Sequence, residues 1–66
     1  MEGKLIGGNV KDARVAAGLS QEQLAATLGV SVMTVSRLER GVVKDVTVSM
    51  LRRVAEALGV DWKALA

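Results

Sequence analysis

The chain has 66 residues, half of them hydrophobic, and a formal net charge of +2. A chain of this length buries only about 60% of its unfolded surface, so residues 1–66 are expected to form one small domain. The sequence has no cysteine and no histidine. These absences exclude disulfides and thiolate zinc sites, and the scattered acidic residues form no catalytic pair. We therefore expect no enzyme, no cofactor and no bound metal.

No apolar run approaches the roughly 20 residues that a membrane-spanning helix requires. The opening residues, MEGKLIGG, lack the apolar segment of a signal peptide. These features predict a soluble, cytoplasmic protein without a membrane partner. The sequence pI of about 9.5 permits a nucleic-acid partner without requiring one.

The first apolar residues recur at the spacing of a helix, which predicts a helix over 6–17 that ends at Gly18. The adjacent glycines Gly7 and Gly8 weaken the first turn of this helix. The periodic residues are Leu5, Ile6, Val10, Ala13 and Ala17.

Two short helices follow, each with a clear start. A capping box, SQEQ beginning at Ser20, predicts a helix over 21–28. Ser31 is a cap for a helix over 32–40. The interval between these helices is three or four residues and includes a glycine, which is typical of a helix-turn-helix unit, here about 20–40.

The next segment, 41–46, is predicted to be a loop, with Thr47 capping a fourth helix over 48–58. The β-branched residues of 42–48 leave a strand as a weaker alternative. Three valines make this loop unusually apolar, which indicates self-association. They are Val42, Val43 and Val46.

Asp61 begins a fifth short helix, WKALA. Its Trp62 and Leu65 either close the core or form a dimer contact.

The central stretch GLSQEQLAATLGVSVMTVSRLERG, with LRRVAEALGV downstream, resembles the Xre-type, lambda-repressor-like helix-turn-helix family. The resemblance implies an all-α, compact five-helix domain with the helix-turn-helix at helices 2 and 3. It implies a DNA-binding transcriptional regulator from a bacterium, archaeon or phage that acts as a homodimer. The chain departs from the family at the Gly-Gly pair of helix 1, at Val46 where a proline is common, and at Val32 and Met33 where polar residues are common.

The third helix carries the candidate recognition residues. Positions 32, 33, 36 and 37 share one side of this helix, with Thr34 at its edge. Val32 and Met33 are suited to pack on thymine methyl groups, while Arg37 is suited to a bidentate contact with guanine. For Val32 and Met33, a protein interface or the core remain alternatives.

The resemblance implies that Gln21 contacts a phosphate, as the free N–H groups of a helix start would favour. Arg40 and Lys44 flank a loop that runs near the phosphates in this fold. The predicted DNA-binding set is Gln21, Ser31, Val32, Met33, Thr34, Ser36, Arg37, Arg40 and Lys44.

Other charged residues are weaker candidates or have a structural role. The resemblance implies that Arg14 pairs with Glu39 and ties helix 1 to the end of helix 3. Arg52 and Arg53 are read as surface charges of the fourth helix. Lys4 and Lys11 are weaker DNA-contact candidates.

The leading functional hypothesis is a repressor that binds a palindromic operator as a dimer, with no small-molecule effector indicated. The alternative is a protein-interaction module of the same fold, such as a bridging factor or an antitoxin-like partner. The residues form either a regulator that dimerises by itself or part of a larger one.

Overall fold

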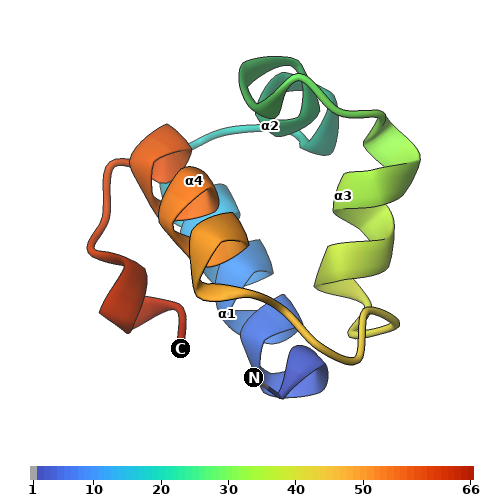
Figure 1. The fold of residues 1–66 in the computed structure, drawn as a ribbon. Coiled ribbons are helices and arrows are strands. Elements are labelled where there is room, and N and C mark those ends of the chain that lie inside the picture. The colour runs from blue at the N-terminus through green and yellow to red at the C-terminus, as the bar shows by residue number, and fades with distance from the viewer. Residues whose placement is uncertain (1) are drawn as a thin grey trace.

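Four α-helices and one short turn build the fold in the computed structural model, which describes residues 2–66 (Figure 1). No strand forms among these residues, so the all-α prediction is confirmed. The elements are α1 (Gly3–Ala16), α2 (Gln21–Leu28), α3 (Val32–Glu39), α4 (Val48–Leu58) and the 3₁₀ turn η1 (Trp62–Ala64).

The predicted fifth helix is not confirmed as an α-helix, because η1 is a 3₁₀ helix of only three residues. Its hydrogen bonds run from the Ala64 amide to the Asp61 carbonyl and from the Leu65 amide to the Trp62 carbonyl, each spanning three residues. Asp61 caps this turn as predicted. Leu65 then lies buried in the core, with Trp62 partly buried beside it.

The first helix begins at Gly3, three residues before the predicted start. The Glu2 side chain accepts hydrogen bonds from the amides of Lys4 at 2.6 Å and Leu5 at 3.1 Å. This cap satisfies two free N–H groups of the first turn, which offsets the weakness that glycine brings to a helix.

The helix-turn-helix unit is built as the sequence predicts. Ser20 and Gln23 form the capping box, with the Ser20 side chain accepting at 3.0 Å and the Gln23 side chain accepting at 2.8 Å. Gly29 has the left-handed φ of 72° that ends α2, and the Ser31 side chain caps α3. Only residues 29–31 separate the two helices.

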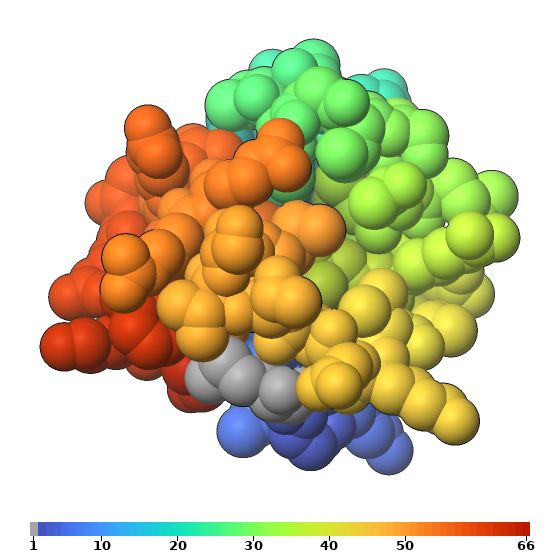
Figure 2. Space-filling view, in the orientation of Figure 1, coloured from blue at the N-terminus to red at the C-terminus, as the bar shows by residue number. Residues whose placement is uncertain are grey.

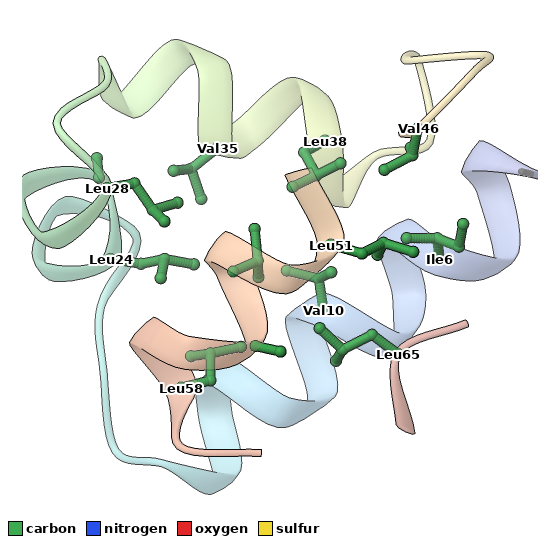
Figure 3. Packing of buried hydrophobic residues seen from close by; sticks show 13 residues of the cluster. Ile6, Val10, Leu24, Leu28, Val35, Leu38, Val46, Leu51, Leu58 and Leu65 are labelled. Atoms are coloured by element: carbon green, nitrogen blue, oxygen red, sulfur yellow. The ribbon is translucent and has the colours of Figure 1, made fainter. Parts of the chain in front are cut away.

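The hydrophobic core lies among the helices, with α1 in contact with both α3 and α4 (Figures 1 and 3). Figure 3 shows Val35 and Leu38 reaching inward from α3, and Val46 entering from the loop before α4. The buried hydrophobic residues are Ile6, Val10, Leu24, Ala25, Leu28, Val35, Leu38, Val46, Leu51, Val54, Ala55, Leu58 and Leu65.

The loop after α3 corrects two expectations. Val46 is only 3% exposed, so it is a core residue and not part of an association surface. Val42 and Val43 remain exposed. The strand alternative is also wrong, because within residues 2–66 the segment forms no strand and makes one isolated antiparallel bridge, between Asp45 and Glu2.

The two neighbouring glycines of α1 have opposite environments. A Cβ atom on Gly7 would overlap the Leu38 carbonyl oxygen and would lie 2.8 Å from the Glu39 carbonyl oxygen. A Cβ atom on Gly8 would meet nothing within 4 Å. Gly7 therefore lets the backbone of α1 lie directly against the end of α3, while Gly8 only weakens the helix.

Candidate nucleic-acid interface

The two sides of α3 differ sharply in burial. Val35 and Leu38 are in the core. Val32 is 38% exposed and Met33 is 55% exposed, and Arg37 is exposed on the same outer side. The core alternative for Val32 and Met33 is therefore wrong, because Val35 and Leu38 occupy the inner side of the helix.

The start of α3 is fixed by two hydroxyl residues. The Ser31 hydroxyl oxygen accepts a hydrogen bond from the Thr34 amide at 3.2 Å. The hydroxyls of Ser31 and Thr34 also lie 3.0 Å apart and form a hydrogen bond. Both residues are exposed, so they hold the first turn in place at the same surface as Val32 and Met33.

The end of α3 is held by a nearly buried ion pair, as the resemblance implied. The Arg14 Nε atom lies 2.6 Å from Glu39 Oε2, and Nη2 lies 3.1 Å from Oε1. Arg14 Nη1 also donates to the Leu19 carbonyl oxygen at 2.8 Å. The hydrogen bond to Glu39 raises the pKa of Arg14, against the opposing effect of burial. The pair thus ties α1 to α3 through two side-chain hydrogen bonds.

Gln21 joins this pair, which the sequence did not indicate. Its side-chain Nε2 donates to Glu39 Oε1 at 3.1 Å, and the residue is half-buried. The start of α2 is therefore fixed against the end of α3. Gln21 keeps its place at the first position of α2, where free backbone N–H groups favour an anion.

The remaining polar and basic candidates lie on α3 and the loop that follows. In the part of the chain that the structure describes, the exposed Arg37 guanidinium has no hydrogen-bond or ion-pair partner. Arg40 Nε donates weakly to the carbonyl oxygen of the half-buried Ser36, at 3.4 Å. Lys44 is exposed on the loop. Figure 2 shows α3 along one edge of the molecule and continuous with this loop.

The two arginines of α4 have intramolecular partners. Arg53 Nη2 donates to the Leu28 carbonyl oxygen at 2.7 Å, which satisfies a free carbonyl at the end of α2. The Arg52 guanidinium lies 5.5 Å from the centre of the Trp62 ring, within cation–π range. Sequence reasoning missed both roles, because each joins residues that are distant along the chain.

The acidic residues of the described chain, 2–66, do not gather into a metal site. That part of the chain has no group of three or more His, Cys, Asp or Glu residues that could hold a metal ion. Nor does any helix in it combine the length and apolar character needed to cross a bilayer.

The sequence of residues 10–65 matches the model of a helix-turn-helix family. The match covers most of the chain, so the protein belongs to this family of Xre-type, lambda-repressor-like DNA-binding domains. No curated protein sequence matches the chain significantly.

Three solved structures share this fold. The restriction-modification controller protein C.AhdI from Aeromonas hydrophila is 32% identical with a TM-score of 0.84, over 96% of this chain and 94% of that one. The clp gene regulator ClgR from C. glutamicum is 31% identical with a TM-score of 0.87, over 94% of this chain and 79% of that one. Apo-HppE is 29% identical with a TM-score of 0.91, over all of this chain and 36% of that one.

Proposed function

We propose that the protein is a DNA-binding transcriptional regulator that reads double-stranded DNA with α3 in the major groove. The observation that carries this proposal is the outer side of α3, where Val32, Met33 and Arg37 are exposed beside each other on a helix whose inner side is fixed. Its membership of a DNA-binding family supports the proposal, as does its likeness to a controller protein and a gene regulator.

Base recognition is assigned to the exposed residues of α3. Arg37 has no partner within the described chain, so its guanidinium is available to donate two hydrogen bonds to guanine O6 and N7. Val32 and Met33 offer no hydrogen bond to a base, but they fit the thymine methyl, the apolar group of the major groove. Such a surface reads guanine beside thymine.

The other predicted residues are assigned to orientation and to phosphate contact. Ser31 and Thr34 hold the start of α3, and the carbonyl of Ser36 accepts from Arg40. Gln21 offers the start of α2 to a phosphate. Arg40 and Lys44 add affinity that depends on salt and not on sequence.

We further propose that two copies bind a palindromic operator as a homodimer and act as a repressor. One helix-turn-helix unit covers little DNA, whereas two copies on half-sites about 34 Å apart place both recognition helices in successive major grooves. Val42 and Val43, exposed on the loop, are the candidate self-association residues. A dimer on an operator that overlaps a promoter would exclude polymerase from it.

Selection of bound sites from randomised duplex DNA tests this function. Wild type and Arg37→Ala are compared at one stated salt concentration, with Lys63→Ala as the control because it removes one exposed positive charge from η1. We expect wild type and Lys63→Ala to enrich the same palindrome with a guanine in each half-site. Arg37→Ala should lose its preference at that guanine.

A protein-interaction module is the second candidate, favoured by the exposed apolar start of α3 and the modest net charge. In that case no motif would be enriched, and binding to DNA would be weak and lost at moderate salt. The same selection therefore separates the two candidates.

A further inference from the structure

We infer that the start of α1 sets the position of the phosphate-contacting loop. The amino-terminal clamp, defined as residues 2–7, holds the loop at residues 41–45 and thereby places Lys44. This inference rests on the proposed function, because it assigns a positioning role within DNA binding.

The clamp contacts the loop at one residue before Lys44 and at one residue after it. Glu2 forms the isolated antiparallel bridge with Asp45. Gly3 lies so close to Val43 that a Cβ atom there would overlap the Val43 carbonyl oxygen and lie 2.9 Å from its carbonyl carbon. The backbone of Lys44 is thus fixed from both directions, while its side chain is exposed.

The clamp also contacts the chain where α3 ends. Gly41 has a φ of +75°, and a Cβ atom on it would lie 2.7 Å from the Lys4 Cα atom. Gly7 packs on the carbonyl groups of Leu38 and Glu39. These contacts follow the chain from the last turn of α3 into the loop, so one segment of α1 fixes both.

The contacts of Gly3 and Gly7 are with main-chain atoms, which decides their consequence. A side chain added at Gly3 meets the Val43 carbonyl, and no change of rotamer can move a carbonyl away. Either the loop or the start of α1 must shift. In either case the packing that holds the loop is lost. Since ordered packing fixes the position of a binding group in advance, we expect Lys44 to lose its phosphate although Lys44 itself is unchanged.

The test compares wild type, Gly3→Ala and Gly8→Ala on the operator found by selection, at a temperature where circular dichroism shows all three folded. Gly8→Ala is the matched control, because it adds the same methyl group to the same helix in open space. Affinity is measured between 50 and 200 mM salt. The slope of log K against log salt is negative, and removal of one phosphate contact from the interface makes it less steep by about 0.9.

We expect Gly3→Ala to bind more weakly than wild type. If Lys44 no longer reaches its phosphate, the decline in affinity between 50 and 200 mM salt should be about 3.5-fold smaller than in wild type. The preference for guanine, which depends on Arg37, should be unchanged. Gly8→Ala should match wild type in affinity and slope. A purely structural role for Gly3 would lower the melting temperature and leave the slope unchanged.

Lys44→Ala completes a double-mutant cycle. We expect it to lower the slope in wild type and to add little in the Gly3→Ala background, because the two changes remove the same interaction. Equal effects of Lys44→Ala in both backgrounds would overturn the inference, as would an unchanged slope for Gly3→Ala or for Lys44→Ala alone. Failure of wild type to enrich any motif would instead reject the proposed function.

A second variant covers the case in which Gly3→Ala does not fold. Glu2→Ala removes the cap on the amides of Lys4 and Leu5 and loosens the clamp without adding atoms. It should change the slope in the same direction by a smaller amount. A wild-type slope for Glu2→Ala in a folded protein would count against the clamp.

Discussion

The two sides of α3 show how one eight-residue helix serves two purposes. The inner side is held by the core, by the Arg14–Glu39 pair and by the close packing of Gly7. The outer side is exposed, and the Arg37 side chain has no hydrogen-bond or ion-pair partner among residues 2–66. An isolated helix of this length is unstable in water, so its order comes from the inner side. The outer side is therefore not needed to order the helix, and its residues are available to bind a partner.

The largest expected effect comes from breaking the inner side at its ion pair. Arg14→Ala leaves the buried Glu39 carboxylate without its charged partner, which typically costs about 3–5 kcal/mol. A domain of this size has a free energy of unfolding of only about 3–10 kcal/mol, so this variant should lose a large part of its stability. Arg40→Ala, at an exposed position, should cost less than about 0.5 kcal/mol. Urea titrations that give equal losses for the two variants would contradict this prediction.

The next effect separates the two glycines of α1. Gly7→Ala forces a methyl group against the backbone of α3 and should cost about 1–3 kcal/mol or more. Gly8→Ala should stabilise the protein by about 0.5–1 kcal/mol, since alanine is the better helix former and the space is open. Thermal melts of both variants should therefore shift in opposite directions. An upward shift for both variants would show that helix propensity, not close packing, governs this pair.

A substitution on the outer side of α3 should change DNA binding and leave stability almost unchanged, whereas substitutions on the inner side change stability. Arg37→Ala should leave the free energy of unfolding within about 0.5 kcal/mol of wild type, because the side chain has no partner in the described chain. Discrimination at the guanine of the half-site should fall by about 1–3 kcal/mol. Urea titration and competition binding with the guanine replaced measure the two quantities on one sample. A substantial loss of stability would show that the two sides of α3 are not independent.

The smallest expected effect concerns the thymine methyl. Met33→Ala should weaken operator binding by about fourfold, the worth of one buried methylene or methyl group at about 0.8 kcal/mol. Replacing the contacted thymine by deoxyuridine, which lacks the methyl, should weaken wild type by a similar factor. The two changes together should do little more than either alone. Additive losses would place Met33 away from the thymine.

Local patterns determined much of the fold. Ser20, Ser31 and Thr47 each cap the helix that follows, because a cap and the amide that it satisfies lie within three residues along the chain. Helical spacing likewise placed Val35 and Leu38 inside. The exposure of Val32 and Met33 agrees with that same spacing.

The exposed side chains of the candidate site were predictable from the sequence. The contacts that hold α2 and α3 in place were less predictable. The resemblance supplied the pairing of Arg14 with Glu39, which composition and spacing do not indicate. The contacts of Gln21 with Glu39 and of Arg53 with Leu28 were not expected from any local pattern. Each spans 18 or 25 residues, so it depends on how two helices cross.

The sequence by itself determined where three of the four α-helices begin, where α2, α3 and α4 end to within one residue, and which side of α3 faces outward. Only the tertiary structure decided the different roles of Gly7 and Gly8, and the burial of Val46 beside the exposed Val43. Neighbouring residues of the same type carry the same local preferences. Their difference comes from the backbone that packs against one and leaves the other open, which is set by the arrangement of the whole chain.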